Sequence, residues 1–492
     1  MRQTTFEEVK AIAGSGDYRL IPVCREILSD IRTPLNVLRA LQNVSSHCFL
    51  LESVEDSRRW GRYTFLGYDP RMELTCKDHI LTIRSGGEIR TKTEHPAEYI
   101  RQIVADNKSP AIPGLPTLTG GLVGFFSYDY IQYGEPMLKL KKDEQGFADM
   151  DLMLFDKLIA FDNLKQTMIL IVNIRTDHLE VNYNRGQMKL DEMENLVRNG
   201  KPKENPGGRL LEELKPALSK PEFCKRVEKI RHYIREGDIF QLVFSNPMKA
   251  RFEGSLLDTY RILRTTNPSP YMFYFSGDTE IAGASPETLV KIDNQTIRTF
   301  PLAGTRPRGK SYEEDQKLEK ELLADEKERA EHNMLVDLGR NDLGRLCKFG
   351  TVEVEQYMTI ERYSHVMHIG SAVKGELRDD VQAIDAVDSV LPAGTLSGAP
   401  KFRACQLIDE LEDDRRGIYG GAIGYVDFTG NLDVCIAIRL AYKKDGMLYV
   451  RSGAGIVADS VPENEYQECV NKAAAVVNAV KEAEKLREEK VE

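Results

Sequence analysis

The sequence lacks the cysteine spacing, the long apolar runs and the basic blocks that mark several common protein classes. Its eight cysteines are scattered and none form C-x-x-C pairs, so neither a zinc ribbon nor a redox dithiol is supported. The longest apolar stretches, such as residues 168–172, are too short to span a bilayer. No Lys or Arg block stands out against the net charge of −10, which argues against nucleic acid or an anionic membrane as a partner.

The start of the chain also lacks an apolar segment of the kind found in secretory signals. Residues 1–19 are polar and mixed in charge. We therefore expect a soluble, cytoplasmic protein. With 492 residues, 41% of them hydrophobic and 29% charged, the chain is long enough for two domains or for one large intertwined unit.

One shift in composition divides the chain. Residues 198–220 are polar and rich in Pro, Gly and Lys, which is typical of a linker. We expect an N-terminal domain over residues 1–200 and a second domain over residues 217–485. Short strand-like runs precede the linker and helices mix with strands after it, so the fold class is predicted as α+β rather than a parallel βαβ sheet.

Two regions allow a more detailed prediction. Residues 221–246 predict a helix, a tight turn at Gly237-Asp238 and then a strand. Near the end of the chain, three segments alternate with period two and predict one antiparallel meander: residues 420–428, 431–442 and 447–455. A helix is expected from about residue 462, with Pro462 in its first turn.

Two E-x-x-E pairs each open an apolar helical pattern: Glu328 with Glu331, and Glu465 with Glu468. Residues three apart share a face of a helix, so each pair presents two carboxylates in one direction. A single pair of this kind is usually a solvated helix face. If the two pairs converge, their oxygens suit a hard cation, above all Mg²⁺. A di-iron centre is a weaker interpretation, because it needs E-x-x-H and His332 lies one position too late.

A strand-borne arginine and a glycine pair form a second candidate set. On an alternating strand over residues 431–442, Arg439 would share a face with the small side chains of Cys435 and Ala437. Gly453 and Gly455 would let backbone N–H groups approach a carboxylate, although a glycine pair most often marks only a turn. A metal, an arginine and such glycines together indicate a small substrate with more than one carboxylate.

Many long motifs resemble the chorismate-utilising enzymes, and within that family the anthranilate synthase component I branch. They cover nearly the whole chain and include "NPSPYMFYF", "GASPETLV", "PLAGTRPRG", "DEKERAEHNMLVDLGRNDLGR", "LPAGTLSGAPK", "RGIYGGAIGY" and "PENEYQECVNKA". The resemblance implies large antiparallel sheets packed as a sandwich with helices on the outside. It also implies a chorismate-binding catalytic domain over residues 217–485, and a tryptophan-feedback element, "LLES" at residues 50–53, in the N-terminal domain.

The resemblance further implies a role for each candidate residue. Glu331 and Glu468 match the Mg²⁺ ligands, with Glu328 and Glu465 beside them. The catalytic set comprises Glu287 as general acid, His368 and Thr395 near the departing enolpyruvyl group, and Gln241. The residues that match the chorismate-binding set are Gly304, Thr305, Tyr419, Arg439, Gly453, Ala454, Gly455 and Lys472. Those that match the tryptophan pocket are Ser53, Pro270, Tyr271 and Met272.

Two positions bear on the choice of reaction within the family. Gln241 stands where water-using relatives carry a lysine base, and Ala303 stands where aminodeoxychorismate synthases carry a lysine that acts covalently. Both favour amination of chorismate at C2 by ammonia, which gives anthranilate and pyruvate. The alternatives are aminodeoxychorismate synthase component I and a non-catalytic tryptophan-binding regulator. Intact Glu287, Glu331, His368 and Glu468 count against the regulator.

The expected partners follow from the same comparison. No cysteine lies in the G-x-C-x-G context of a glutamine amidotransferase nucleophile. We therefore expect a separate glutamine amidotransferase subunit, component II, to supply ammonia from glutamine. L-Tryptophan is expected to inhibit the enzyme from the N-terminal element.

Overall fold

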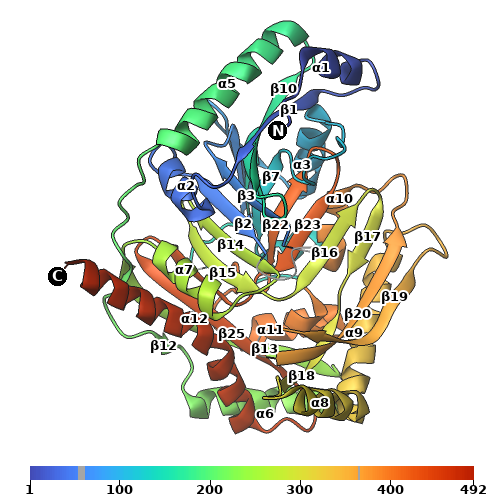
Figure 1. The fold of residues 1–492 in the computed structure, drawn as a ribbon. Coiled ribbons are helices and arrows are strands. Elements are labelled where there is room, and N and C mark those ends of the chain that lie inside the picture. Colours follow the sequence, from blue (N-terminus) through green and yellow to red (C-terminus); the bar gives the residue numbers. More distant parts are fainter. Residues whose placement is uncertain (54–60, 144, 364–365, 492) are drawn as a thin grey trace.

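The computed structural model describes residues 1–53, 61–143, 145–363 and 366–491, which form two large antiparallel sheets with helices around them (Figure 1). One continuous cluster of buried side chains draws on strands of both sheets. The sheets therefore pack face to face. The predicted α+β class and sandwich of antiparallel sheets are confirmed.

Within the described residues the first sheet has 13 strands. Its order is β1 (Leu20–Leu28), β10 (Thr167–Arg175), β9 (Lys157–Asp162), β3 (Tyr63–Tyr68), β2 (Cys48–Glu52), β14 (Tyr271–Ser276), β15 (Glu280–Ser285), β24 (Leu440–Lys444), β25 (Met447–Ile456), β13 (Gln241–Glu253) and β11 (Arg209–Leu210). Two short strands also pair with β13: β12 (Lys215–Pro216) and β21 (Gly398–Ala399).

The second sheet has 12 strands in the same described part of the chain. Its order is β18 (Leu302–Pro307), β20 (Val366–Glu376), β17 (Thr296–Thr299), β16 (Thr288–Asp293), β23 (Leu432–Ile436), β22 (Ala422–Asp427), β7 (Gly121–Phe126), β8 (Met150–Phe155), β4 (Met72–Lys77), β5 (Ile80–Arg84) and β6 (Glu88–Lys92). A further strand, β19 (Glu353–Arg362), pairs with β20.

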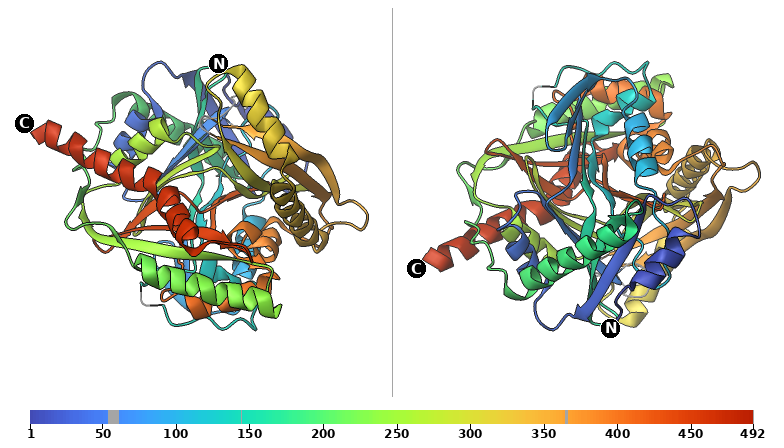
Figure 2. Two further views of the ribbon diagram at one scale, coloured as in Figure 1. Left: turned by 90° about the horizontal axis from the view of Figure 1, so that it is seen from below. Right: turned by 90° about the horizontal axis from the view of Figure 1, so that it is seen from above.

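The helices lie around the sheets, and Figure 2 shows this from two further sides. Those over the outer face of the first sheet are α1 (Phe6–Ala13), α2 (Pro34–Leu41), α5 (Leu179–Asn199), α7 (Leu257–Thr266) and α12 (Pro462–Val491). The others are α3 (Pro96–Asp106), α4 (Ile131–Gly134), α6 (Lys220–Glu236), α8 (Tyr312–Ala324), α9 (Glu326–Gly344), α10 (Ala383–Val390), α11 (Lys401–Leu411) and the 3₁₀ turns η1 (Tyr128–Tyr130) and η2 (Gly394–Leu396). No helix in the described ranges combines the length and apolar character that a membrane crossing needs.

Both halves of the chain contribute strands to both sheets. In the first sheet β2 pairs with β14, which follows the linker by more than fifty residues of sequence. In the second sheet β7 pairs with β22. The segments before and after the linker therefore share their sheets and their core, and backbone hydrogen bonds run across the expected domain boundary.

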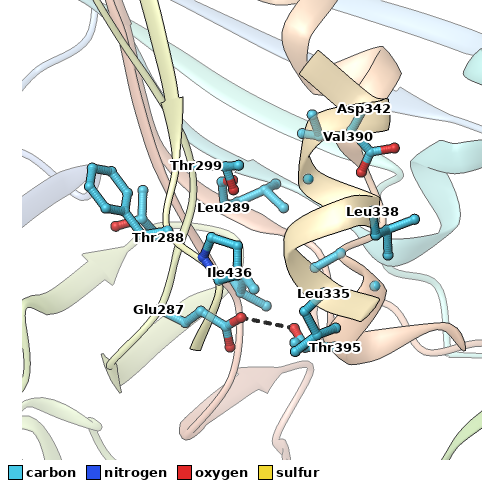
Figure 3. A pocket seen from close by; sticks show the side chains of 15 residues that line it. Glu287, Thr288, Leu289, Thr299, Leu335, Leu338, Asp342, Val390, Thr395 and Ile436 are labelled. Atoms are coloured by element: carbon cyan, nitrogen blue, oxygen red, sulfur yellow. Dashed lines mark hydrogen bonds between the residues drawn. The ribbon is translucent and has the colours of Figure 1, made fainter. Parts of the chain in front are cut away.

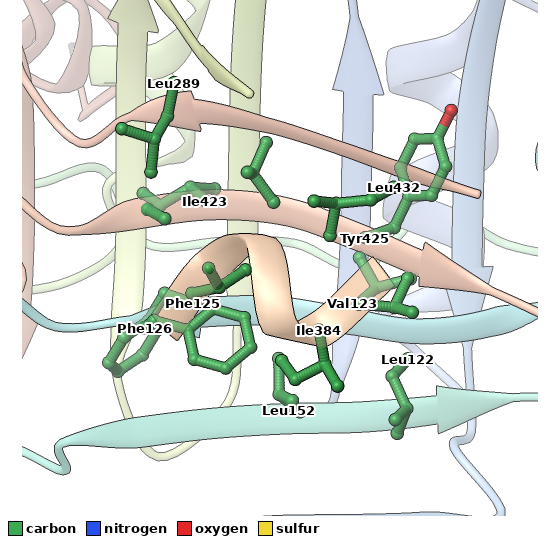
Figure 4. Packing of buried hydrophobic residues seen from close by; sticks show 14 of the residues in the cluster. Leu122, Val123, Phe125, Phe126, Leu152, Leu289, Ile384, Ile423, Tyr425 and Leu432 are labelled. Carbon is green, nitrogen blue, oxygen red and sulfur yellow. The ribbon is translucent and has the colours of Figure 1, made fainter. Parts of the chain in front are cut away.

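The strand β7 lies at the centre of this shared core. All six of its residues are buried, and successive side chains of a strand point to opposite faces. Figure 4 shows Phe125 and Phe126 of β7 packed among Leu152 of β8, Ile423 of β22 and Ile384 of α10. A strand buried on both faces lacks polar alternation, which is why its sequence reads as a continuous apolar run.

Local predictions for the region after the linker are confirmed. Helix α6 begins with a capping box between Ser219 and Glu222 and ends at Gly237, whose φ of 86° places it in the left-handed region. Strand β13 follows at Gln241, and α12 begins at Pro462 as expected.

The prediction of one continuous meander near the C-terminus is wrong. Strands β22 and β23 pair in the second sheet, whereas β24 and β25 pair in the first. The expected strand over residues 431–442 is broken after Ile436, and the chain crosses between sheets there. Arg439 has a φ of 51° at this crossing, so it does not lie on a strand face with Cys435 and Ala437. Alternation is the same in either sheet, so period two could not reveal the crossing.

Candidate active site

Helices α9 and α12 bring the two acidic pairs toward one another. The side chain of Asp325 caps α9 by accepting hydrogen bonds from the backbone of Lys327 and Glu328. Glu331 follows on the same face. Burial raises the pKa of Glu331, and the charges of Glu328 and of Glu468 on α12 raise it further. Carboxylates from two helices therefore interact across the site, and a bound cation would relieve their repulsion.

The two acidic pairs on α9 and α12 offer only carboxylate oxygens, which are the ligands that Mg²⁺ prefers. In the part of the chain that the structure describes, no three His, Cys, Asp or Glu side chains are close enough to form a metal site on their own. Glu468 Oε1 lies 2.6 Å from Lys472 Nζ, and Glu328 Oε1 lies 3.4 Å from Arg306 Nη1. Binding a metal here requires these carboxylates to exchange their cationic partners for the ion.

Glu287 and Thr395 form the acid–hydroxyl pair of the site. Glu287 immediately precedes β16, and Thr395 lies in η2. The Thr395 hydroxyl donates a 3.0 Å hydrogen bond to Glu287 Oε1 (Figure 3). Burial raises the pKa of Glu287 to about 7, although Thr395, Arg439 and Lys472 act to lower it. Near neutral pH a large share of Glu287 is thus protonated and able to give up a proton.

A small cavity of about 50 Å³ lies beside Glu287. Its apolar wall comes from Leu289, Leu335, Leu338, Val390 and Ile436. Figure 3 shows Glu287 and Thr395 at one end, Asp342 at the other and α9 along one side. Asp342 accepts a hydrogen bond from Lys401 Nζ at 3.0 Å. The apolar wall explains why Glu287 favours its neutral form.

His368 is held in a defined tautomer by the neighbouring strand. Its Nδ1 lies 2.9 Å from the carbonyl oxygen of Gly304 and 3.1 Å from Thr305 Oγ1. A carbonyl only accepts, so Nδ1 carries the hydrogen and Nε2 keeps a lone pair. Burial lowers the pKa of His368, which keeps the ring neutral. Gly304 has a φ of 64°, and a Cβ there would come within 3.1 Å of Glu328 Oε2, so glycine lets β18 approach α9.

The glycines of β25 open space for two polar side chains. A Cβ on Gly453 would lie 3.0 Å from the Tyr419 hydroxyl, and one on Gly455 would lie 2.8 Å from Gln241 Nε2. Lys472 Nζ donates to the carbonyl of Gly453 at 3.2 Å. Gly453, Ala454 and Gly455 are strand residues paired with β13, so the interpretation of the glycine pair as a mere turn is wrong.

Arg439 joins this group from the crossing between the sheets. Burial lowers the pKa of Arg439, whereas the charge of Glu287 acts to raise it. Arg439 and Lys472 both act on Glu287 and on His368. The crossing therefore delivers a cation that interacts with the acid and the imidazole.

Comparison with known proteins establishes the family of the chain. A family model described as chorismate binding enzyme matches residues 46–478. The chain belongs to this family. An anthranilate synthase component 1 from Acetivibrio thermocellus is 46% identical over 98% of this chain and 99% of its own length. One from Aquifex aeolicus is 43% identical over 99% of both chains.

Solved structures agree with the family assignment. Anthranilate synthase component I from Streptococcus pneumoniae superposes with a TM-score of 0.75 at 37% identity, over 92% of this chain and 99% of its own. A menaquinone-specific isochorismate synthase from Escherichia coli has a TM-score of 0.68 at 20% identity, over 96% of this chain and 98% of its own, and supports the fold alone. Of these two solved structures, the anthranilate synthase component I is the more similar to this chain in sequence.

The residues matched to the family's tryptophan pocket lie at neighbouring strand ends but not on one face. Ser53 directly follows β2, where Glu52 pairs with Met272 of β14. The Tyr271 hydroxyl donates to Asp433 Oδ1 at 2.8 Å and lies 2.9 Å from Thr288 Oγ1. Met272 belongs to the hydrophobic cluster between the outer face of the first sheet and the helices that cover it, among them α7. Tyr271 and Met272 thus point to opposite faces, as consecutive strand residues must.

Sequence reasoning missed a group of buried charges next to residues that match the family's chorismate-binding set, such as Tyr419. Glu412, Arg416 and Arg451 are only 3%, 1% and 3% exposed, and both arginines contact Glu412 directly. The motif "RGIYGGAIGY", which begins with Arg416, was the available signal. That motif indicates the family, but nothing in its spacing shows that Arg416 is buried.

The packing at Gly455 predicts a specific effect on substrate binding. Gly455→Ala should raise the KM for chorismate by roughly tenfold or more, because the new methyl group would displace the amide of Gln241. Steady-state kinetics and a thermal melt would measure this. Gly87→Ala is the matched control, since a Cβ there meets nothing within 4 Å. An unchanged KM with an intact fold would mean that this part of β25 does not face the substrate.

Proposed function

We propose that this protein is the large subunit of anthranilate synthase, which converts chorismate and ammonia to anthranilate and pyruvate. The observation that carries the proposal concerns Gln241 and Ala303, two positions at which relatives with other reactions have a lysine. Gln241 stands beside Gly455 in the site, and Ala303 stands next to Gly304 on β18. A neutral amide cannot deprotonate water and a methyl group offers no nucleophile, so the site suits ammonia, whose lone pair attacks unaided. Relatives 43–46% identical over nearly the whole chain carry the matching name.

The first chemical step replaces a hydroxyl group by an amine. Ammonia forms a bond to C2, the ring double bonds shift, and the C4–O bond breaks. Glu287 transfers its proton to the departing oxygen, which leaves as water, and the ammonium group formed at C2 loses one proton to solvent and becomes the amine. The raised pKa of Glu287 keeps that proton available near neutrality. The Thr395 hydroxyl then stabilises the carboxylate that remains.

The second step releases pyruvate. A base removes the proton from C2, the C3–O bond breaks and the ring becomes aromatic. The released enolate takes a proton at its methylene carbon and becomes pyruvate. His368 is suited to act as the base, because its Nδ1–H is bound to Gly304 and its Nε2 lone pair is free to accept.

Cationic and backbone groups hold the two carboxylates of the substrate. Arg439 and Lys472 supply positive charge, and the strand glycines Gly453 and Gly455 let the substrate approach the backbone and Tyr419. Glu331 and Glu468 would hold Mg²⁺, which supplies neutralisation of a substrate carboxylate when bound. Glu328 and Glu465 lie beside them and add negative charge to the same place.

A glutamine amidotransferase subunit would supply the ammonia. The relatives are named as component 1, and this chain has no G-x-C-x-G nucleophile of its own. The competing functions remain aminodeoxychorismate synthase component I, which would aminate C4, and a regulator that binds tryptophan without catalysis.

Product identification tests the reaction. The purified chain with chorismate, Mg²⁺ and an ammonium salt should yield anthranilate, detected by its fluorescence and by mass. Glutamine in place of ammonium should yield none until a glutamine amidotransferase subunit is added. A C4-aminated product would establish the aminodeoxychorismate alternative, and no turnover of chorismate would favour the regulator.

Charge removal tests the proposed metal ligands. Glu331→Gln and Glu468→Gln should each weaken Mg²⁺ binding by roughly tenfold or more, because a neutral amide is a poorer ligand for a hard cation. Calorimetric titration with Mg²⁺ and the Mg²⁺ dependence of turnover would measure it. Glu463→Gln, an exposed change on the same helix α12, is the control. Equal affinities in all three variants would show that the acidic pairs are surface charge.

Tryptophan inhibition tests the role of the N-terminal element. L-Tryptophan at millimolar concentration should inhibit anthranilate formation, and Ser53→Phe should abolish that inhibition by filling the pocket with a ring. Inhibition requires that tryptophan bind a less active arrangement better than the active one. Ser46→Phe, an exposed change just before β2, is the control. If L-tryptophan does not inhibit the native enzyme, feedback inhibition is excluded. If it still inhibits the Ser53→Phe variant, the tryptophan site does not include Ser53.

A further inference from the structure

Three charged groups are buried together behind the site. Arg416 Nη2 lies 2.6 Å from Glu412 Oε1, and Arg416 Nε lies 3.0 Å from Oε2. Arg451 Nη2 lies 3.1 Å from the same Oε2. The backbone N–H and the hydroxyl of Ser245 both donate to Oε1, at 2.9 and 2.8 Å. The carboxylate of Glu412 is therefore fully hydrogen-bonded, and the forked geometry of Arg416 is fixed.

The remaining donors of Arg416 reach three elements of the active site. Nη1 donates to the carbonyl of Leu396 at 2.5 Å, and Nη2 donates to the carbonyl of Val243 in β13 at 2.7 Å. The guanidinium carbon lies 5.9 Å from the ring centre of Tyr419. Leu396 is the residue after Thr395, and Val243 lies two residues after Gln241. One buried side chain thus contacts the turn that carries Thr395, the strand that carries Gln241, and Tyr419.

We propose that Arg416 is a positioning residue for the reaction, which acts by holding the η2 turn so that the Thr395 hydroxyl stays directed at Glu287. This inference rests on the proposed function, in which Glu287 is the proton donor. Arg416 contacts neither of these side chains and acts through the Leu396 carbonyl. Arg451 shares the same carboxylate, but its other donors bind Ser245 Oγ and the carbonyl of Arg415.

The η2 turn is held by its own backbone bonds, by one backbone bond from β13 and by Arg416. It is a three-residue 3₁₀ helix whose backbone bonds include Leu396 N–H to the carbonyl of Ala393 and Ser397 N–H to the carbonyl of Gly394. These bonds are internal to the turn. Just after the turn, the backbone N–H of Val243 in β13 donates to the Ser397 carbonyl at 2.9 Å, and the guanidinium of Arg416 adds a second link to β13 through the Leu396 carbonyl. Without that bond the Leu396 carbonyl would lose a charged donor in a buried place.

The expected consequence concerns the protonation of Glu287. The groups that act on its charge are the Thr395 hydroxyl, Arg439 at the crossing and Lys472 on α12, and Asp342 lies at the far end of the adjoining cavity. The Thr395 hydrogen bond favours the carboxylate form. If the turn moves, that bond is lost while Arg439 and Lys472 remain. Glu287 should then hold its proton to a higher pH and place it less well for transfer.

The test compares two buried arginines that share one carboxylate. Arg416→Lys keeps the charge beside Glu412 but cannot reach Glu412, Leu396 and Val243 together. At a fixed concentration of unprotonated ammonia, kcat should fall by about tenfold or more. The pH at which kcat/KM declines on the basic side should rise by about 0.5–1 unit. Arg451→Lys should leave that pH unchanged, whatever its effect on stability.

A double variant separates positioning from general damage. Thr395→Val should raise the pH at which kcat/KM declines by the same amount. Arg416→Lys combined with Thr395→Val should raise it no further, because both substitutions remove the same hydrogen bond between Thr395 and Glu287. Three outcomes would overturn the proposal. The pH at which kcat/KM declines could shift equally in Arg451→Lys, could stay unchanged in Arg416→Lys, or could shift additively in the double variant.

Two further measurements keep the outcome interpretable. Circular dichroism shows whether Arg416→Lys folds. If it does not, the double variant Arg416→Gln with Glu412→Gln removes both charges together and is compared with Arg451→Lys in the same way. The product of the native enzyme is identified first. A product other than anthranilate refutes the proposed function, and the pH comparison is then run on that reaction, where it still decides the role of Arg416.

Discussion

The buried carboxylate of Glu412, shared by two guanidinium groups, is the interaction on which the site depends. Burial alone would raise the pKa of Glu412, but Arg416 and Arg451 outweigh it and hold the pKa below its ordinary value. Removing one partner from such a group costs about 3–5 kcal/mol, because a buried charge is left uncompensated. The group ties α11, β13, β25 and η2 together. The elements that carry Gln241, Thr395 and Gly453 are therefore fixed relative to one another.

Helix α9 shows how one element can serve two chemical environments. Glu328, Glu331, Leu335, Leu338 and Asp342 recur at helical spacing and share one face. Near its N-terminus that face presents carboxylates toward α12. Further along it becomes the apolar wall of the cavity beside Glu287. The proposed cation site and the apolar cavity beside Glu287 thus lie next to each other. Burial raises the pKa of Glu331 in the first and of Glu287 in the second, and a bound cation would favour the ionised form of Glu331.

Local features of the fold could be predicted because they depend on neighbours in sequence. The capped helix α6, the left-handed Gly237 and the start of α12 all follow from residue type and spacing. The division of residues 431–442 between two sheets could not be predicted, because it depends on which distant strands each half meets. Arg439 illustrates that error: its charge interacts with that of Glu287 because the chain turns there and not because of a strand face.

The candidate site residues came mainly from the family resemblance, and the structure supplied their arrangement. Pattern alone left each acidic pair as a solvated helix face, because convergence of α9 with α12 is a tertiary fact. Glu412, Arg416 and Arg451 were missed for a similar reason. Sequence rules place charged residues on the surface, and only the folded chain shows that these three satisfy one another.

The proposed feedback element is connected to Glu287, the proposed proton donor, by a short series of contacts. Tyr271 pairs with Ser285 across the β14–β15 hairpin, and the Ser285 hydroxyl donates to the carbonyl of Ile436 at 2.7 Å. The Tyr271 hydroxyl also contacts Thr288, which adjoins Glu287. A ligand that moved Tyr271 would therefore disturb the backbone on both sides of Glu287. Strand β2 pairs directly with β14. The N-terminal element is therefore separated by one strand from the residues around Glu287, and no long series of contacts between separate domains is needed.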